Sequence, residues 1–535
     1  MTSSLLTLEG VSFVLPDGRV LFHDLFESLD ARPTGLVGGN GVGKSVLGQL
    51  CAGLLEPTSG TCRRAVSVHY LAQQADAGSG SVASLAGVAP VLAALSRIEA
   101  GGVDVADFDL VGTQWDLREH FASALAAARL EHLNADTPAA NLSGGEAMRV
   151  ALLGARLSDA AYLILDEPTN HLDSAHRAEL MAWLAEWRGG LLVISHDRAL
   201  LERMERTIEL TPGGLRSYGG GYGLYGAHKA DEREAALREL ASARAERRRG
   251  ERALREQGER QARRTARGAR EGKTANQAPI LLGRRKEQGE ASAARSAEQQ
   301  AMHLAQLNDR TRKAAAAAGP DTAVVLRAPK GTPPTGRVAH LNNVVLPWGP
   351  DHLRAIDLAI TGRQRIGVIG PNGSGKSTLL KVLGGEVLPA SGSASVFVPF
   401  ARLDQRLAQL DPSLTLIEQL KASTSHLSEG DLRSRLALLG LGIETVASPM
   451  AGLSGGERLK AALALAILAS PPARLLLLDE PTTHLDLPSI EAVEAMLREY
   501  TGALMVVSHD TAFLNGLGLT HRCQATNDGW ITDTW

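Results

Sequence analysis

Four short motifs occur twice in this chain, in the same order, and this repetition limits the possible folds more than any other feature. A glycine-rich loop, an L-S-G-G-E string, an L-D-E-P-T string and an S-H-D string each appear once in each half. The L-D-E-P-T aspartate precedes the S-H-D histidine by 30 residues in both copies, from Asp166 to His196 and from Asp479 to His509. Because chance matches would not keep both order and spacing, the chain is a tandem duplication of one domain.

The glycine-rich loop reads G-G-N-G-V-G-K-S in the first copy and G-P-N-G-S-G-K-S in the second, each after a short apolar strand. Glycines let such a loop curl until its backbone N–H groups face phosphate oxygens, and the following helix adds its positive N-terminal end. The lysine would reach the β- and γ-phosphates of ATP, and the serine would bind Mg²⁺. The predicted nucleotide-binding residues of the loops are Gly38, Asn40, Gly41, Gly43, Lys44, Ser45, Val46, Gly370, Asn372, Gly373, Gly375, Lys376, Ser377 and Thr378.

Each copy also predicts a strand that ends in two acids. Tyr-Leu-Ile-Leu precedes Asp166 and Glu167, and Leu-Leu-Leu-Leu precedes Asp479 and Glu480. Such apolar runs are typical of a central parallel strand that is buried on both faces. We expect the two aspartates to hold Mg²⁺ through water. The two glutamates are the predicted catalytic residues that polarise the attacking water, a contribution of ~10²–10⁴-fold for general bases.

The stretch between the copies has a different composition. From Lys229 to Lys313 it holds 22 lysines and arginines against 13 acidic residues, a balance of +9, whereas the whole chain carries −3. Its alanines, glutamates, glutamines and arginines favour helix, and pairs such as Glu251–Arg255 and Glu256–Arg260 lie one helical turn apart. We predict an antiparallel helical pair with its turn near Gly272–Pro279. The predicted domains are residues 1–228, a basic helical linker at residues 229–330, and residues 331–535.

With these motifs in both copies, the chain resembles the ATP-binding cassette (ABC) ATPases, whose signature is L-S-G-G-E. The resemblance implies two α/β P-loop domains, or cassettes, each with a mixed or parallel sheet and a helical subdomain, joined by a helical hairpin. It also implies a monomer whose cassettes pair head to tail around two ATP molecules, each held by the phosphate loop of one copy and the signature of the other. A Ser-Gly-Gly at a helix N-terminus would itself bind an anion. The implied sites are Lys44, Asp166, Glu167 and His196 with Ser454, Gly455 and Gly456, and Lys376, Asp479, Glu480 and His509 with Ser143, Gly144 and Gly145.

The resemblance further implies a switch histidine and a metal-sensing glutamine in each copy. His196 and His509 follow short apolar strands and match the catalytic histidine that contacts the γ-phosphate. Gln405 matches the glutamine of the second copy, as a metal ligand. In the first copy Gln73 and Gln74 both fit, and Gln73 matches slightly better.

An aromatic residue that stacks on adenine is expected near the first strand of each copy. Phe13 fits this role in the first copy, with an ordinary core aromatic as the alternative. The second copy has Leu346 at the matching position and Trp348 two residues further on, so its stacking residue stays open.

The first copy reads E-P-T-N-H-L-D from Glu167 to Asp173, and this string resembles a hallmark of the ABC-F family; the second copy has Thr483 in place of Asn. That family acts on the ribosome, as translation factors or as proteins that protect it from antibiotics. The resemblance implies that the basic linker reaches rRNA and tRNA, and linker arginines can neutralise RNA phosphates. The alternative is a solvated helical pair that only spaces the cassettes.

Two other functions are compatible with paired ATP-binding motifs. The chain could be the ATPase subunit of an ABC membrane transporter with a separate permease, but an arginine-rich helical pair has no evident use there. An ABC-type DNA-repair ATPase needs zinc modules, which Cys51, Cys62 and Cys523 cannot build. The longest apolar run, Ala461–Ala469, is far shorter than the ~20 residues of a membrane span. We therefore expect a soluble, cytoplasmic protein without direct membrane insertion.

Overall fold

The structure is a computed structural model that describes residues 4–73, 80–170, 172–274, 295, 298–299, 301–315, 317, 336–424 and 427–535. The chain divides into two units. The first comprises Met1–Tyr225 and Ala323–Trp535 and holds both cassettes, and the second comprises Gly226–Thr322 and holds the linker.

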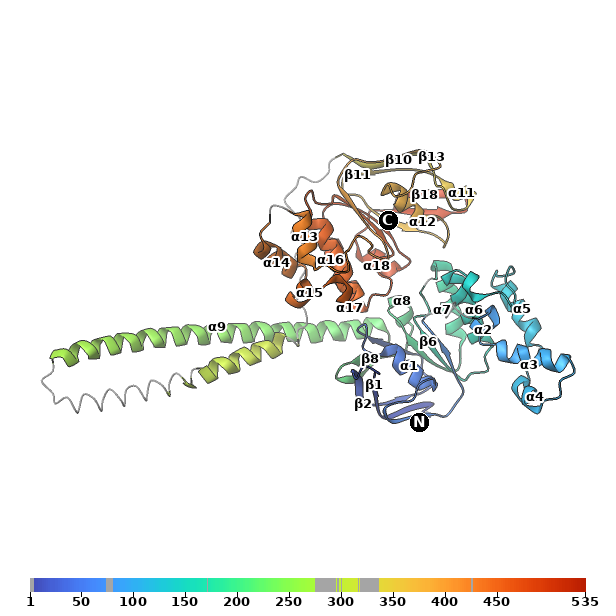
Figure 1. The fold of residues 1–535 in the computed structure, drawn as a ribbon, viewed down its shortest axis with the longest axis horizontal. Coiled ribbons are helices and arrows are strands. Elements are labelled where there is room, and N and C mark those ends of the chain that lie inside the picture. Colours follow the sequence, from blue (N-terminus) through green and yellow to red (C-terminus); the bar gives the residue numbers. More distant parts are fainter. Residues whose placement is uncertain are drawn as a thin grey trace. The chain divides into compact units, whose positions relative to one another are not determined.

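A six-stranded sheet forms the centre of the first cassette (Figure 1), with the strand order β5-β6-β7-β3-β8-β9. Neighbouring strands are parallel, except that β9 runs antiparallel to β8. β6 and β7 are buried along their whole length, as expected for central parallel strands. The strands are β3 (Thr34–Gly38), β5 (Val68–Leu71), β6 (Tyr162–Asp166), β7 (Gly190–Ile194), β8 (Arg206–Thr211) and β9 (Gly214–Gly219).

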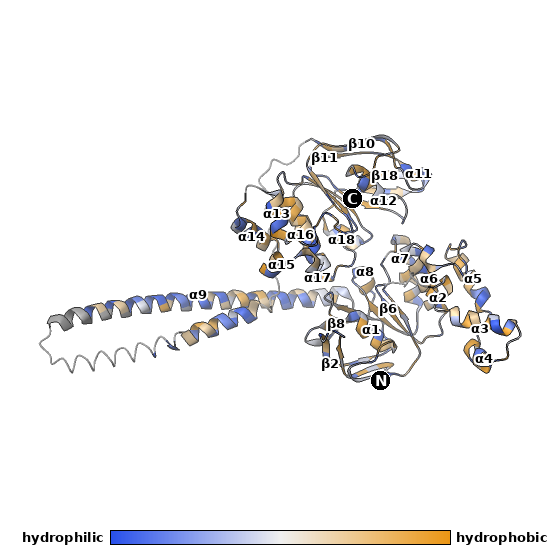
Figure 2. Cartoon of the chain, viewed as in Figure 1, coloured by the Kyte–Doolittle hydropathy of each residue, from blue (hydrophilic) through white to orange (hydrophobic). Residues whose placement is uncertain are grey.

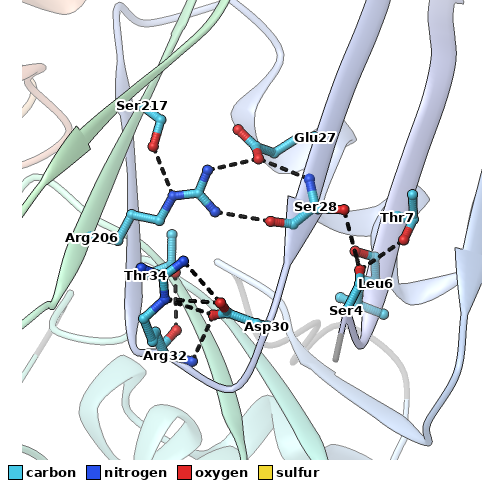
Figure 3. Close-up of polar contacts among 10 residues, drawn as sticks. All are labelled: Ser4, Leu6, Thr7, Glu27, Ser28, Asp30, Arg32, Thr34, Arg206 and Ser217. Carbon is cyan, nitrogen blue, oxygen red and sulfur yellow. Dashed lines mark hydrogen bonds and ion pairs between the residues drawn. The ribbon is translucent and has the colours of Figure 1, made fainter. Parts of the chain in front are cut away.

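A smaller antiparallel sheet has the order β2-β1-β4, formed by β1 (Leu6–Val14), β2 (Val20–Leu29) and β4 (Ser59–Arg64). It shares one apolar core with α1 (Lys44–Ala52) and the central sheet. Arg206 of β8 joins the two sheets (Figure 3): its guanidinium donates to Glu27 Oε1 at 2.7 Å, to the Ser28 carbonyl at 2.9 Å and to Ser217 Oγ at 2.7 Å. The sheet that follows the N-terminus is therefore fixed to the nucleotide-binding sheet by polar contacts as well as by its core.

The helical subdomain of the first cassette has its own apolar core, around Phe121 and Leu125. It is built from α2 (Val82–Leu85), α3 (Ala89–Glu99), α4 (Val105–Val111), α5 (Leu117–Ala127), the 3-10 helix η1 (Ala139–Asn141) and α6 (Gly144–Leu157). α6 also packs against β5 and so connects the subdomain to the central sheet. The remaining helices of this cassette are α7 (Ser174–Glu186) and α8 (Arg198–Leu201).

The second cassette repeats this design, with sheet orders β14-β15-β16-β12-β17-β18 and β11-β10-β13. Its strands are β10 (Arg337–Val345), β11 (Ala355–Thr361), β12 (Arg365–Ile369), β13 (Ser391–Val396), β14 (Phe400–Leu403), β15 (Leu475–Asp479), β16 (Ala503–Val507), β17 (His521–Thr526) and β18 (Gly529–Thr534). Its helices are α11 (Asp351–Arg354), α12 (Lys376–Leu383), α13 (Leu416–Ser423), α14 (Glu429–Leu438), α15 (Ile443–Ala447), η2 (Met450–Gly452), α16 (Gly455–Leu468), α17 (Leu487–Glu499) and α18 (Thr511–Gly516). The predicted fold class, two α/β cassettes with helical subdomains, is thus confirmed.

The linker unit contains one long helix, α9 (Tyr222–Thr274), which starts before the predicted boundary at residue 229. Its first turn belongs to the cassette unit, because Tyr225 is buried and its hydroxyl donates to Glu209 Oε1 at 3.2 Å. Figure 2 shows hydrophilic residues along the described length of α9, with apolar residues between them. Residues 275–279 of the predicted turn lie outside the described residues.

Residues 301–315 form a helix that runs antiparallel to α9. Arg310 donates to Glu246 at 2.6 Å and to Glu239 at 2.8 Å, and Ala314 shares an apolar cluster with Leu240 and Ala243. The predicted pair Glu256–Arg260 forms at 3.2 Å. Glu251, however, contacts Arg247 at 3.4 Å rather than Arg255, which faces Glu259 at 3.7 Å.

Candidate functional site

Both glycine-rich loops lie between a buried central strand and a helix, as the motif requires. β3 leads into the first loop and α1, and β12 leads into the second loop and α12. Gly38 and Gly370 adopt φ 154°, Gly41 and Gly373 adopt φ 75°, and the glycines that cap the helices, Gly43 and Gly375, have φ 102° and 93°. These left-handed positions are the reason for glycine, since side chains rarely tolerate them. The two loops therefore share one backbone conformation.

The lysine of each loop is buried and held in place by the loop itself. Lys44 Nζ donates to the carbonyls of Gly38 at 2.7 Å and Gly39 at 3.1 Å. Lys376 Nζ donates to the carbonyls of Gly370 at 2.9 Å and Pro371 at 2.7 Å. Each ammonium group is thus fixed at the mouth of its loop, where a phosphate oxygen would meet it.

The aspartates at the ends of β6 and β15 lie beside the loop serines. Ser377 Oγ donates to Asp479 Oδ1 at 2.9 Å, and in the first cassette Ser45 lies near enough to Asp166 to influence its pKa. Burial raises the pKa of both carboxyls, and the neighbouring serine hydroxyls oppose that rise. A serine hydroxyl and a carboxylate at one point are hard oxygen ligands of the kind that Mg²⁺ prefers.

The glutamate after each aspartate has a strained backbone conformation, with φ 49° at the buried Glu167 and 48° at the half-buried Glu480. His196 Nε2 lies 3.6 Å from Glu167 Oε1, and His509 Nε2 lies 3.5 Å from Glu480 Oε1. Burial raises the pKa of Glu167 to about 8 and that of Glu480 to about 7. It lowers the pKa of both histidines to about 3, so they are neutral at physiological pH. The same acid and histidine pair therefore occurs in both cassettes.

Several buried oxygens at these acids have no hydrogen-bond partner among the described residues: Asp166 Oδ1, Glu167 Oε1 and Glu480 Oε1. A buried acceptor without a partner is costly and needs an explanation. A metal ion with its water molecules would supply the missing partners. The residues present therefore fit a magnesium ion at the aspartates and a water molecule at the glutamates.

The signature strings begin helices, as predicted. Ser143 caps α6 and Ser454 caps α16, each in a capping box with the glutamate of the same string. Glu146 accepts from Ser143 N at 2.9 Å and Oγ at 2.7 Å, and Glu457 accepts from Ser454 at 3.0 Å and 2.7 Å. The glycine pairs that follow lie in the first helical turn, where free N–H groups and the helix dipole favour anions.

One cleft of about 1300 Å³ is lined by both cassettes. This exceeds the ~300–1,000 Å³ of a pocket for one small ligand. Among the residues that line it are Lys44, Ser45, Gln73, Asp166, Glu167, His196, Lys376, Ser377, Gln405, Glu480 and His509, with Ser143, Gly144 and Gly145. Ser454, Gly455 and Gly456 are not among them, but Gly455 lies next to His484 and Leu485, which do line the cleft.

Sequence reasoning missed the residues that join each phosphate loop to the opposite cassette. Asp486 caps α17 and its Oδ2 accepts from Asn40 N at 3.0 Å, while Asp173 caps α7 and its Oδ2 accepts from Asn372 N at 3.0 Å. Arg177 Nη1 donates to the His509 carbonyl at 3.2 Å. Asp173 ends the E-P-T-N-H-L-D string and Asp486 ends the matching string of the second copy, so the repeated aspartate is the signal that the sequence offers.

Phe13, which the sequence predicts to stack on adenine, packs against the apolar core of the first cassette. Phe13 packs against Phe22, with ring centroids 6.4 Å apart, and is not among the described residues that line the cleft. Leu15, two residues further on, does line it, and so does its counterpart Trp348, which is 62% exposed. The reason is that β1 pairs irregularly with β2 near Phe13, so its side-chain alternation cannot be read from the sequence. Gln74 lies outside the described residues.

No helix in the described part of the chain is long and apolar enough to cross a membrane. The two halves of the chain match the ABC transporter family model, over residues 30–170 and 353–483. The chain is 31% identical to the tylosin resistance ATP-binding protein TlrC of Streptomyces fradiae, covering 95% of each chain.

Two further relatives cover nearly the whole chain. The energy-dependent translational throttle protein EttA of Escherichia coli K12 is 29% identical over 99% of this chain and 94% of its own. ABC transporter F family member 5 of Arabidopsis thaliana is 28% identical over 99% of this chain and 76% of its own. With two complete phosphate loops, signature helices and acid pairs in one polypeptide, the chain belongs to the ATP-binding cassette family of ATPases, and within it to the F type.

Proposed function

We propose that this ATPase uses two composite sites to switch between a ribosome-bound and a free state in the cytoplasm, as a translation factor or as a protein that protects the ribosome from an antibiotic. The observation that carries the ribosome part is the linker unit. It is strongly basic, whereas the rest of the chain is acidic, and its described arginines are largely exposed. Such a segment can neutralise RNA phosphates while the cassettes do not bind RNA indiscriminately.

The names of the relatives also support a role in translation or in antibiotic resistance. TlrC is named for resistance to tylosin, and EttA is named as a translational throttle. The two matches cover 95% and 99% of this chain, so the likeness is not restricted to the cassettes.

At the first site, we assign Lys44 and the loop amides to the phosphates, with Ser45, Gln73 and Asp166 as ligands of a magnesium ion. When bound, that ion would neutralise phosphate charge. Ser454, Gly455 and Gly456 would approach the γ-phosphate from the opposite cassette. The second site would use Lys376, Ser377, Gln405 and Asp479, with Ser143, Gly144 and Gly145. The hydrogen bonds from Asn40 to Asp486 and from Asn372 to Asp173 support this pairing.

Glu167 and Glu480 are the residues we assign to accept the proton of the attacking water. Each has a buried oxygen without a partner among the described residues and a pKa raised by burial towards neutrality, the range in which a general base works best. The neutral His196 and His509 place Nε2 3.6 Å and 3.5 Å from Oε1 of those glutamates. They would orient the γ-phosphate by donating a hydrogen bond to it.

The test is co-sedimentation of the full chain with ribosomes in the presence of ATP. The Glu167→Gln, Glu480→Gln double variant should bind ATP without hydrolysing it and should remain with the ribosomes. The matched control is Lys44→Ala, Lys376→Ala, which should lose ATP binding and stay at the top of the gradient. If the double glutamine variant also stays at the top while it still binds ATP, the ribosome is not the partner.

A further inference from the structure

Two cysteines that are eleven residues apart in the sequence meet in the first cassette. Cys51 lies in the last turn of α1 and is 1% exposed, and Cys62 lies on β4 and is partly buried. Both side chains pack in the same apolar core of the first cassette, and each thiol shifts the pKa of the other. The sequence alone offered no reason to connect them, because they do not form a C-x-x-C pair.

A guanidinium group completes this cluster. Arg64 donates from Nη1 to the Leu50 carbonyl at 3.2 Å, which holds it over the end of α1. The neighbouring Cys51 thiol and the charge of Arg64 lower the pKa of the Cys62 thiol, whereas burial and Glu56 raise it. The neighbouring Cys62 thiol and burial raise the pKa of Cys51. Cys62, the less buried of the two, therefore ionises more readily than Cys51. Cys62 would be the attacking thiol and Cys51 the resolving thiol.

The second cassette shows that the fold does not need these thiols. Cys51 follows Lys44 by seven residues, and Leu383 follows Lys376 by seven. Cys62 follows Gly60 (φ 83°) by two residues, and Ala394 follows Gly392 (φ 81°) by two. Leu383 is buried and Ala394 packs against the same core, so an apolar pair fills this space equally well. At the position of Arg64 the second cassette has Val396. The first cassette thus has two thiols and a guanidinium where the second has three apolar side chains.

We infer that Cys51 and Cys62 form a redox modification site that a peroxide converts into a disulfide within the first cassette. The Cys62 thiolate attacks one peroxide oxygen, the O–O bond breaks, and a sulfenic acid and one water form. The Cys51 sulfur then attacks the Cys62 sulfur, the S–S bond forms and a second water leaves. Two thiols lose their hydrogens and one peroxide is reduced to two waters.

The disulfide would join the helix that follows the first phosphate loop to β4. β4 pairs with β1 in the antiparallel sheet, with Leu8 opposite Cys62. In the reduced protein, packing and the hydrogen bond from Arg64 to the Leu50 carbonyl hold these two elements together. The cross-link would add a covalent bond between them, in the first cassette alone. This inference does not depend on the ribosome proposal.

The experiment uses the full chain in its reduced form, treated with hydrogen peroxide, then alkylated under denaturing conditions and digested for mass spectrometry. The expected product is one cross-linked peptide pair that contains Cys51 and Cys62. Cys523 serves as the internal control, since it is fully buried in the second cassette. It should be recovered alkylated, not oxidised. Recovery of Cys51 and Cys62 as separate alkylated thiols would overturn the inference, as would oxidation of Cys523 at the same rate.

Three variants borrow residues from the second cassette, so they are designed to keep the core filled. Cys62→Ala and Cys51→Leu should each abolish the cross-linked peptide, and Cys62 in the Cys51→Leu variant should stop at the sulfenic acid, which dimedone traps. Arg64→Val should retain both thiols but slow alkylation of native Cys62 by iodoacetamide and move its pH midpoint upwards. An Arg64→Val protein with unchanged alkylation kinetics would show that the guanidinium does not activate the thiol, and would contradict the proposed site.

Discussion

The two nucleotide sites share one backbone frame but differ in the side chains around it. In the first cassette Tyr70 of β5 donates from its hydroxyl to Asp166 Oδ2 at 3.0 Å. At the equivalent position in β14, Arg402 places Nη1 4.0 Å from Asp479 Oδ2 and binds Glu386 as well. The acid that we assign to magnesium is thus oriented by a neutral donor in one site and by a cation in the other.

The difference extends to the walls of the cleft. Trp348 offers an exposed ring where the first cassette has Leu15. Arg177 of α7 donates to the carbonyl of His509, whereas the equivalent residue of α17 is Ile490, which cannot. The two copies keep the residues that we assign to phosphate, while the residues around them differ. Equal motifs therefore do not imply equal nucleotide affinities at the two sites.

The largest effect is expected from the glutamates, where the two sites are alike. The Glu167→Gln, Glu480→Gln double variant should lower steady-state ATP turnover by ~10²-fold or more, because both general bases are lost. Each single variant should lose most of the turnover, since the sites share one cleft. Phosphate release measures this, with Glu179→Gln, on the exposed face of α7, as a control that should match the parent. A single variant with undiminished turnover would show that its site does not hydrolyse ATP.

The next largest effect is expected from Trp348 and Leu15, the equivalent cleft-lining residues of the two cassettes. Trp348→Ala should weaken nucleotide binding at the second site by about tenfold, because stacking of a base on an aromatic ring contributes ~1–3 kcal/mol. Leu15→Ala should change binding much less. Titration with a fluorescent ATP analogue would show two affinities, of which Trp348→Ala moves one. Equal losses in both variants would mean that the tryptophan does not contact adenine.

A smaller effect is expected from the donor to Asp166. Tyr70→Phe removes one neutral hydrogen bond of ~0.5–1.5 kcal/mol. The Mg²⁺ concentration for half-maximal turnover should therefore rise a few-fold, because the carboxylate is less well oriented. Turnover measured over a magnesium series tests this, and an unchanged midpoint would show that Asp166 is held in place without Tyr70.

The smallest effect lies at the other end of β6. The buried Tyr162 hydroxyl has no hydrogen-bond partner among the residues described, and the second cassette has Leu475 at that position. Tyr162→Phe should leave the free energy of unfolding unchanged or raise it by about 1 kcal/mol, since an unsatisfied buried group is removed. Thermal unfolding measures this, and turnover should match that of the parent. A clear loss of stability would mean that a water molecule serves the hydroxyl.

The sequence predicted those parts of the site that one contiguous segment determines. The loop glycines, the strands that end in acids and the capped signature helices each follow from local pattern, and the structure has them where expected. The contacts that depend on distant segments could not be predicted: Asp173 with Asn372, Tyr70 with Asp166, and Cys51 with Cys62. Phe13 shows a third case, in which irregular pairing of β1 removes the alternation on which side-chain direction depends.

The helix α9 of the linker forms although its sequence contains four glycines, which disfavour helix. Gly250, Gly258, Gly268 and Gly272 each disfavour helix by ~1 kcal/mol relative to alanine, yet α9 continues through all four. The helix at residues 301–315 packs against residues 236–250 and so stabilises the segment of α9 that contains Gly250. The exact pairs of charges could not be predicted, because Glu251 has an arginine one turn away in both directions and selects Arg247.

The capping boxes at Ser143 and Ser454 have a kinetic consequence. Serine and glutamate already hold the first turn of α6 and of α16 in its final shape. The glycine N–H groups beyond them are therefore aimed before a phosphate arrives, and no backbone ordering has to accompany its capture. A substitution that breaks either capping box should therefore slow the capture of a phosphate rather than change the chemistry that follows.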